Sequence, residues 1–489
     1  MNSQPHVVIV GGGLAGLSAA VALTKQNFRI TLLESRPRLG GRATSIIDQT
    51  TGELIDNCQH VNMGCCVNFQ HLCELTGSRQ HLITEHQLQF LGRDGVVNRL
   101  RNGWLPAPAH LAAAFACFSY LSLRDKIDLA RGMWSFMRNP TWPGDSLIDF
   151  LNQSRQTSQA INRFWNPVLV SALSEDLSRI SYHYARQVFV EGFLSHREGW
   201  KVQLLNIPLG QFYDGVIKSW LESQGVKLRL QAGVKQLELN GEVDSQITGV
   251  TLTNGETVSA DHVILAVSFD RVMSLLPDQL ANTEPYQSIS QIESAPISSL
   301  HFWFDRPITA LRHAVLIDRT SQWMFNRTAI LNSEQKYGKP DKYAYQIVIS
   351  NSRSTRQRTG VSQRTQQELI EEVHQELKEI WPETRTAQLL HARAITEHRA
   401  VFSVLPEIDK LRPLQQTEFS NLQIAGDWTS TGWPATMEGA VRSGFLAAEN
   451  VIPIGDPHAK PHVRATELLP SVFARVFMKN SNLKFCKFE

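Results

Sequence analysis

The feature that most restricts the fold lies near the start of the chain, where residues 6–34 read HVVIVGGGLAGLSAAVALTKQNFRITLLE. A run rich in Val and Ile precedes the glycines, apolar residues at helical spacing follow them, and a second apolar run ends on Glu34. The two runs predict β-strands, and the segment between them predicts a helix. We therefore expect a β-α-β unit and an α/β fold.

The glycines of this unit have the spacing of a dinucleotide-binding loop. Gly11, Gly13 and Gly16 form G-x-G-x-x-G between the predicted strand and helix. The first permits a tight turn, the second lets the backbone approach a pyrophosphate, and the third lets helix and strand pack closely. Phosphate charge would then lie at the helix N-terminus, beside the N–H groups of Leu14 and Ala15.

The residues after the loop indicate which dinucleotide binds. Glu34, at the end of the second predicted strand, can accept hydrogen bonds from both ribose hydroxyls and would repel the 2′-phosphate of NADP. The following RPRLGGRATS contains Gly41 and Arg42 and resembles the extension found in flavoproteins of the glutathione-reductase fold. That resemblance implies FAD, with Arg42 as a fixed positive charge near the pyrophosphate or flavin. We find no second dinucleotide fingerprint, so an external reductant or the substrate must exchange electrons with the flavin.

A second strand-turn-helix pattern occurs at residues 422–444, LQIAGDWTSTGWPATMEGAVRSG, hereafter the closing stretch. It delivers Gly426 and Asp427 to the end of a predicted strand, where a carboxylate can bind the ribityl chain or water near the pyrophosphate. The helix start at Met437 and Glu438 would direct N–H groups toward the N1 and O2 edge of the flavin. Val234 completes the residues that we assign to the cofactor.

The closing stretch resembles the flavin amine oxidase and phytoene desaturase superfamily. Within it, the segments DNCQHVNMG (residues 56–64) and FWNPVLVSALSE (residues 164–175) are most similar to the hydroxysqualene dehydroxylases of squalene and hopanoid biosynthesis. Cys58 stands where the family usually has glycine. Thr436 stands where amine oxidases place an aromatic wall for the amine, and the closing stretch contains no cysteine that could form a thioether to the flavin. The resemblance therefore implies non-covalent FAD.

The chain has 489 residues, which is too long for one simple core. We expect a discontinuous, Rossmann-like FAD-binding domain of the glutathione-reductase type and an inserted mixed α+β substrate domain, with residues 76–200 mostly helical. The domains are expected at 1–75, 201–285 and 416–451 for FAD, at 76–200 and 286–415 for the substrate and the membrane-facing part, and at 452–489 for a C-terminal tail.

Composition excludes several classes of function. The net charge of +2 gives no reason to expect a nucleic-acid partner, and the six cysteines lack the spacing of a zinc site. The chain enters its first predicted strand without a secretion signal, and no uncharged apolar run reaches the roughly 20 residues that a bilayer-spanning helix needs. We expect a cytoplasmic protein without a resident metal.

The resemblance implies that reduced flavin delivers hydride to an allylic carbon of hydroxysqualene as the hydroxyl leaves, giving squalene. An acid must protonate the leaving oxygen, and His60 is the leading candidate because its ordinary pKa suits proton donation. A purely structural His60 is an equal alternative. A phytoene or diapophytoene desaturase-like or amine oxidase-like activity also stays open, as does a flavin- and lipid-binding protein without turnover.

A C30 isoprenoid implies contact with a membrane. Burying its carbons from water at about 0.8 kcal/mol each would gain about 24 kcal/mol, more than the roughly 18–21 kcal/mol limit of non-covalent affinity. The substrate must therefore arrive from a bilayer. Residues 104–123 (WLPAPAHLAAAFACFSYLSL) predict either a helix lying in the inner face of the cytoplasmic membrane or a buried core helix. The tail, with Arg475, Lys479, Lys484 and Lys487, predicts either a second membrane-binding segment or a docked terminal helix.

Overall fold

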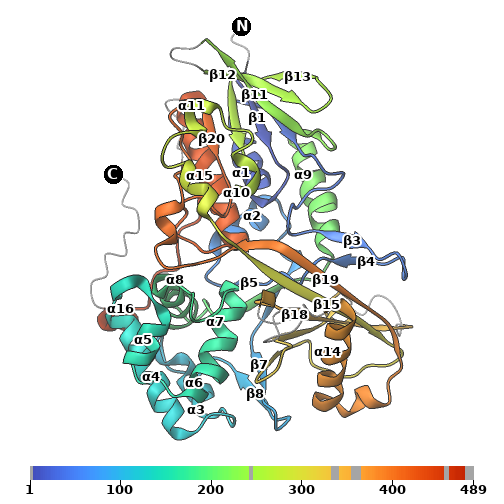
Figure 1. Ribbon diagram of the computed structural model, residues 1–489, viewed down its shortest axis with the longest axis vertical. Helices are drawn as coiled ribbons and strands as arrows, with labels where there is room; N and C mark the ends of the chain where they lie inside the picture. Colours follow the sequence, from blue (N-terminus) through green and yellow to red (C-terminus); the bar gives the residue numbers. More distant parts are fainter. Residues whose placement is uncertain (1–3, 242–245, 332–340, 354–364, 456–461, 479–489) are drawn as a thin grey trace.

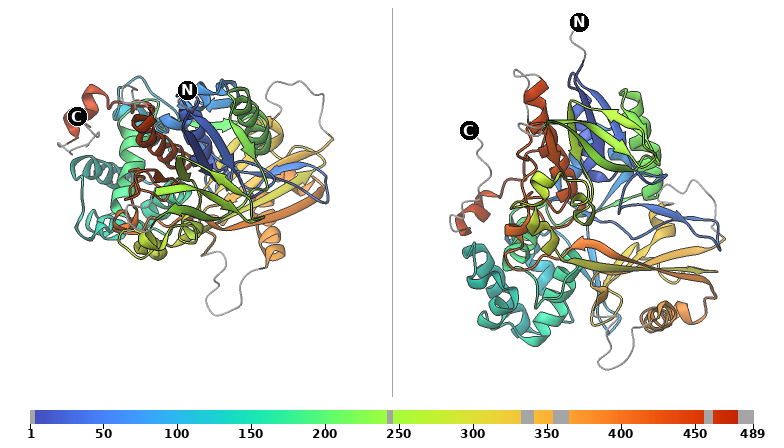
Figure 2. Two further views of the ribbon diagram at one scale, coloured as in Figure 1. Left: turned by 90° about the horizontal axis from the view of Figure 1, so that it is seen from above. Right: turned by 45° about the horizontal axis from the view of Figure 1, so that its top comes forward.

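The computed structural model describes residues 4–241, 246–331, 341–353, 365–455 and 462–478. It contains a parallel sheet, a larger mixed sheet and a helical lobe (Figure 1). The helical lobe and the mixed sheet lie side by side below the parallel sheet, as both Figure 1 and the right-hand view of Figure 2 show.

The parallel sheet unites parts of the chain that are far apart in sequence. Its strand order is β10 (Lys227–Arg229), β2 (Arg29–Leu33), β1 (His6–Val10), β14 (His262–Leu265) and β20 (Leu422–Ile424). Every pair is parallel, so the carboxyl ends of all five strands reach the same edge. In open α/β sheets this is the edge that binds ligands.

The sheet is covered on both faces, as the alternation of side chains along β1 demonstrates. Val7 and Ile9 join one apolar cluster with helices α1 (Leu14–Leu23), α9 (Lys218–Ser223) and α15 (Met437–Gly455). Val8 and Val10 join another, with residues of the antiparallel strands β11 (Val234–Asn240), β12 (Gln246–Leu252) and β13 (Thr257–Ser259). The sheet thus forms the middle of three layers.

The mixed sheet has seven strands. Their order is β19 (Leu389–Phe402), β15 (Ser294–Phe304), β18 (Tyr343–Ile349), β17 (Trp323–Asn326), β16 (His313–Leu316), β7 (Leu88–Leu91) and β8 (Val97–Leu100). Helix α14 (Gln366–Ile380) covers one face through Leu369, Val373 and Leu377. The opposite face contacts the end of β4 (Leu54–Asp56), where Gln346 donates to the carbonyl of Asp56 at 3.5 Å.

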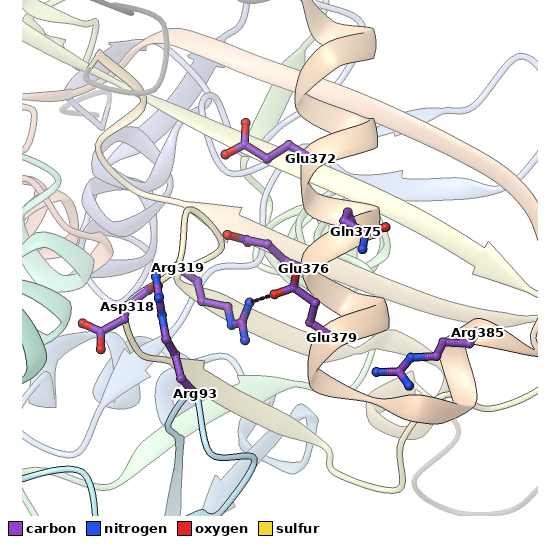
Figure 3. Close-up of a pocket in the computed structure, with 8 residues that line it drawn as sticks. All are labelled: Arg93, Asp318, Arg319, Glu372, Gln375, Glu376, Glu379 and Arg385. Atoms are coloured by element: carbon purple, nitrogen blue, oxygen red, sulfur yellow. Dashed lines mark hydrogen bonds and ion pairs between the residues drawn. The ribbon is translucent and has the colours of Figure 1, made fainter.

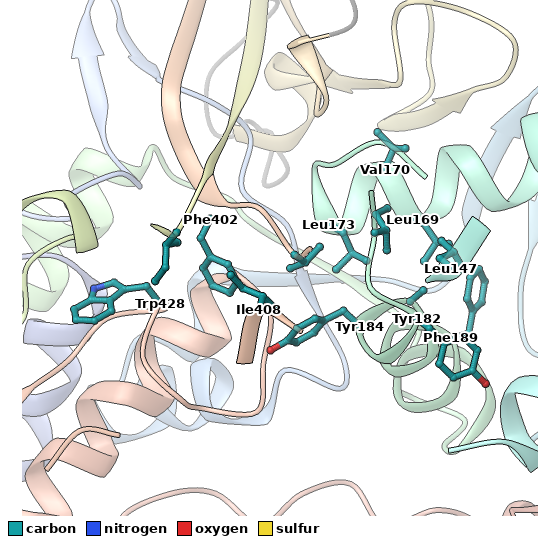
Figure 4. Packing of buried hydrophobic residues seen from close by; sticks show 14 of the residues in the cluster. Leu147, Leu169, Val170, Leu173, Tyr182, Tyr184, Phe189, Phe402, Ile408 and Trp428 are labelled. Atoms are coloured by element: carbon teal, nitrogen blue, oxygen red, sulfur yellow. The ribbon is translucent and has the colours of Figure 1, made fainter. Parts of the chain in front are cut away.

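The helical lobe follows β8. It contains α3 (Ala112–Ala116), α4 (Leu123–Arg138), α5 (Leu147–Gln153), α6 (Ser158–Ala160), α7 (Asn166–Leu173), α8 (Tyr182–Gln187) and the π-helical turn η5 (Val188–Leu194). Figure 4 shows Leu169, Tyr182 and Phe189 of this lobe in one cluster with Phe402 and Trp428, so the lobe shares a continuous core with the closing stretch.

Smaller elements connect these parts. They are β3 (Ser45–Ile47), which pairs with β4, the three strands β5 (Asn62–Met63), β9 (Val202–Leu205) and β6 (Leu82–Glu85), and helices α2 (Val67–Leu75), α10 (Phe269–Val272), α11 (Asp278–Ala281) and α12 (Arg327–Leu331). The described part of the tail, 462–478, returns to the parallel-sheet region and ends with α16 (Val472–Phe477). Arg464 of this tail pairs with Glu449 of α15 at 3.0 Å.

Two predictions for the substrate region are wrong. Residues 82–100 form strands β6, β7 and β8 rather than helices. Residues 104–123 form a short turn and the five-residue helix α3 instead of one long helix. Pro106 and Pro108 lack the N–H that a helix interior needs, which prevents a helix at the start of this segment. In the described ranges, no helix has the length and apolar character to cross a membrane.

Candidate cofactor and substrate site

The glycine loop has no room for side chains. Gly11 has a φ of +111°, a conformation that favours glycine, and a Cβ placed on Gly16 would lie 1.9 Å from the Gly11 carbonyl oxygen. Helix α1 begins after Gly13, and no side chain caps it. The N–H groups of its first turn, at Leu14 and Ala15, are therefore available to an anion.

Glu34 lies directly beside this loop. Its buried carboxylate accepts hydrogen bonds from the N–H groups of Gly12 at 2.6 Å and Arg36 at 2.8 Å. The Ala232 N–H donates to the Glu34 carbonyl at 2.8 Å, which brings the start of β11, with the half-buried Val234, to the same end of β2. Glu34 and Val234, which the sequence assigns to the cofactor, therefore lie at the same corner of the parallel sheet.

The segment Gly40–Arg42 connects the loop to the closing stretch. Gly40 donates to the Gly12 carbonyl at 2.8 Å, and a Cβ on Gly41 would lie 3.1 Å from the Gly13 Cα. The Arg42 guanidinium extends to Asp427, at 2.5 Å, and to the carbonyl of Ala400 at the end of β19. Arg42 lies deep in the protein, yet 31% of its side chain is uncovered.

Hydrogen bonds to the side chains of Thr436 and Glu438 fix the start of α15. Thr436 accepts a hydrogen bond from the Gly439 N–H at 3.1 Å, so its hydroxyl caps the helix that begins at Met437. The fully buried carboxylate of Glu438 accepts hydrogen bonds from the N–H groups of Asn68 and Phe69 at the start of α2. The Glu438 carboxylate is therefore engaged within the protein, and only the backbone of this residue could contact a cofactor.

Arg412 holds the closing stretch in shape, a role that the sequence did not indicate. Its buried guanidinium donates to the carbonyl oxygens of Asp427, Thr429 and Trp433, at 3.0, 2.6 and 2.9 Å. It also pairs with the Asp409 carboxylate at 3.0 Å and donates to the Thr431 hydroxyl at 3.1 Å. These partners come together only in the folded chain, so no sequence motif indicated them.

These features fit a dinucleotide. An uncapped helix N-terminus lies beside a close-packed glycine loop, a carboxylate ends the second strand, and Arg42 provides positive charge between loop and closing stretch. A comparison with protein families agrees, because the model described as flavin containing amine oxidoreductase matches residues 14–452.

The chain belongs to the flavin-containing amine oxidoreductases. It is an FAD-dependent oxidoreductase, and the FAD predicted from its sequence is confirmed.

Curated members of this superfamily cover most of the chain. The 15-cis-phytoene desaturase of Arabidopsis thaliana is 25% identical over 460 residues, which are 91% of this chain and 80% of that protein. The probable zeta-carotene desaturase of Synechococcus elongatus is 24% identical over 481 residues, covering 91% and 98%.

Solved structures agree in fold. An oxidoreductase from Methanosarcina mazei has a TM-score of 0.68 at 16% identity, over 91% of this chain and 99% of that one. A putrescine oxidase bound to putrescine has a TM-score of 0.64 at 15% identity, over 92% and 99%.

His60, which the sequence predicts to be the proton donor, lies in the loop after β4. Its Nδ1 is 3.0 Å from the Cys58 carbonyl oxygen, which assigns the Nδ1 proton to that hydrogen bond. Burial lowers the pKa of the His60 imidazole, with smaller opposing effects from the Cys58 hydrogen bond and Asp56. The structure therefore disfavours the charged form that the acid role requires.

Four side chains of this region are partly exposed: Arg42, Cys58, His60 and Glu191. Glu191 was not singled out by the sequence, because an isolated glutamate in an apolar helical segment has no motif.

A separate polar hollow lies between α14 and the loop near Asp318 (Figure 3). Its charges pair with each other: Arg319 contacts Glu379 at 2.6 Å, and Glu376 accepts the Thr320 N–H at 2.8 Å. This hollow suits water rather than FAD or an apolar substrate.

Proposed function

We propose that the protein reduces the C–O bond of hydroxysqualene and releases squalene. The observation that carries this proposal is the apolar lining of the site. Cys58 and Val61 from the loop after β4, and Ala435 from the closing stretch, pack against the large apolar cluster that includes the core of the helical lobe, and they stay partly exposed. Such surface favours a hydrocarbon substrate over a polar one.

The comparisons and the cap on α15 support an isoprenoid. The two relatives described above are named as desaturases of phytoene and of zeta-carotene. Phytoene and zeta-carotene are isoprenoids. Thr436 uses its hydroxyl to cap α15. At this position the site therefore lacks an aromatic wall for an amine.

The residues that would hold FAD are those gathered around the glycine loop, Arg42 and Asp427. Bound FAD, in its reduced form, supplies a hydride equivalent to carbon. The protein itself provides the orientation of the substrate, the exclusion of water and the proton for the leaving oxygen. An external reductant restores the reduced cofactor.

We also propose that the protein takes this substrate from the inner face of the cytoplasmic membrane. Helices α4 and α16 are in contact, with the rings of Trp134 and Phe477 5.3 Å apart. Together they expose a set of large apolar side chains, hereafter the docking face: Leu123, Ile127, Trp134, Leu469, Val472, Phe473 and Val476.

The charges around the docking face suit an anionic lipid surface. On α4, the exposed Arg124 and Arg131 both pair with the buried Asp128, at 3.8 and 2.9 Å. Arg475 on α16 is exposed as well. Contiguous apolar surface with flanking cations is typical of monotopic binding. Lys479, Lys484 and Lys487 lie outside the described residues.

A desaturase activity is the second candidate, favoured by the similarity to desaturases over 91% of the chain. Anaerobic incubation of chemically reduced holoenzyme with hydroxysqualene, followed by product analysis, separates the two. Squalene is the expected product. Flavin that stays reduced, with no squalene formed, would overturn the proposed function in favour of desaturation, because a desaturase transfers hydride from its substrate to oxidised flavin.

A further inference from the structure

The proposed function, on which this inference rests, requires a proton at the leaving hydroxyl, because hydroxide is a poor leaving group. His60 is poorly suited to donate it, since burial favours its neutral form and its Nδ1 proton is engaged by Cys58. The donor is therefore to be sought among the other titratable groups near the closing stretch.

Glu191 lies between two segments of the cofactor site. It occupies the π-helical turn η5, a local geometry that occurs frequently at functional sites. Gln187, four residues earlier, donates to the Glu191 carboxylate at 3.3 Å and to the carbonyl of Gly432 in the closing stretch at 2.9 Å. A Cβ on the adjacent Gly192 would lie 3.3 Å from Met63, in the segment that follows His60.

The charges around Glu191 favour a protonated carboxyl. Burial raises the pKa of Glu191 to about 7, and the nearby Glu467 adds to this effect. The hydrogen bond from Gln187 and the charges of Arg442 and Arg186 oppose it.

The two arginines are engaged elsewhere. Arg442 forms ion pairs with Glu438, at 2.7 Å, and with Glu467, while Arg186 donates to the Phe136 carbonyl at 2.8 Å. Cys65, a third neighbouring group, has a pKa raised by its hydrogen bond with Cys66 and by burial, so its thiol is neutral.

We propose that Glu191 is the proton donor that converts the leaving hydroxyl into water. The proton passes from the Glu191 carboxyl to the hydroxyl oxygen, and the C–O bond breaks with its electron pair on oxygen. The allylic carbon accepts the hydride equivalent that the reduced cofactor supplies. The Glu191 carboxylate is then reprotonated from solvent.

Single-turnover formation of squalene by reduced holoenzyme, followed from pH 6 to pH 9, tests this proposal. We expect Glu191→Gln to slow squalene formation about 100-fold or more at pH 6, with native FAD content. The native rate should fall as pH rises through about 7, where Glu191 loses its proton, and the Gln variant should lack this step. Glu191→Asp should recover part of the rate.

The result that would overturn the role of Glu191 is a Gln variant that forms squalene at the native rate. A native enzyme that forms no squalene overturns the proposed function, and the role of Glu191 with it. Infrared difference spectra between pH 6 and pH 9 give a readout that needs no turnover. A protonated carboxyl band should disappear at high pH in native protein and be missing in Glu191→Gln, and its absence from native protein at pH 6 also contradicts the proposal.

Glu467→Gln is a matched control, because it removes a carboxyl group that raises the pKa of Glu191. The variant should keep its rate at pH 6 and lose it at a lower pH than native protein. An unchanged pH profile in this variant would contradict the assignment of the titration to Glu191.

Discussion

Arg42 and Asp427 are 385 positions apart in sequence and form an ion pair of 2.5 Å. Asp427 is almost fully covered, and Arg42 is covered to about two thirds, with 31% of its side chain accessible. The pair joins the segment beside the glycine loop to the end of β20. It therefore fixes the distance between the two halves of the cofactor site.

Removing one member of this pair should weaken FAD binding. We expect Arg42→Met to lower FAD affinity by at least tenfold, because the variant leaves Asp427 covered and unpaired and removes a cation from the site. Fluorescence titration of apoprotein with FAD measures the loss. The double variant with Asp427→Asn should lose less than the sum of the single variants, and additive losses would contradict the coupling.

Adding one methyl group where α1 and α15 meet should prevent folding of the cofactor region. A Cβ on Gly444 would lie 2.1 Å from the Ala15 carbonyl oxygen and 2.2 Å from the Ser18 hydroxyl. Gly444→Ala should therefore lower the thermal midpoint and the FAD content of purified protein. Gly215→Ala, with nothing within 4 Å, is the control and should change neither. Equal behaviour of the two variants would exclude this packing argument.

Glu438 should be a stability residue. Glu438→Ala removes the acceptor for Asn68, Phe69 and Arg442 and leaves the buried guanidinium without this partner. Breaking a buried pair in this way costs about 3–5 kcal/mol. Chemical denaturation should show a loss of that order, and a loss below about 1 kcal/mol would contradict the arrangement.

Arg412 should be required for the shape of the closing stretch. Arg412→Met would leave the carbonyls of Asp427, Thr429 and Trp433 without their shared donor. We expect faster proteolysis within residues 427–436 and loss of FAD. Lysine presents fewer donors in a different geometry, so Arg412→Lys should restore little. Full rescue by lysine would show that charge alone suffices.

Charges on the docking face should release the protein from membranes. We expect the double variant Trp134→Glu and Phe473→Glu to lose at least tenfold in binding to vesicles of phosphatidylcholine and phosphatidylglycerol, because both side chains are exposed and apolar. Flotation measures the bound fraction. Leu390→Glu, an exposed leucine on β19, is the control and should bind as native protein does. Unchanged flotation of the double variant would overturn the docking face.

The sequence predicted the local elements of the cofactor site because their signals are local. The strand, glycine loop and helix of residues 6–23 occur where the pattern places them. The closing stretch follows the same logic, with β20 before Gly426 and α15 from Met437.

The parts that the sequence did not reveal depend on distant partners. Arg412 and Glu191 acquire their settings from carbonyls and charges that only the folded chain brings together. The sequence predicted a role for the backbone N–H of Glu438 and did not reveal that its carboxylate caps α2. In residues 104–123 the apolar composition suggested one helix, whereas Pro106 and Pro108 prevent a helix at the start of the segment.

The layout of the parallel sheet sets the order of events during synthesis. Helix α1 has all ten residues buried, in part against α15, which is completed more than four hundred residues later. A nascent chain shorter than 422 residues contains neither β20 nor the helix that covers α1. Insertion of FAD therefore requires a nearly complete chain. A prematurely terminated chain would expose the apolar surface of α1, to which chaperones bind.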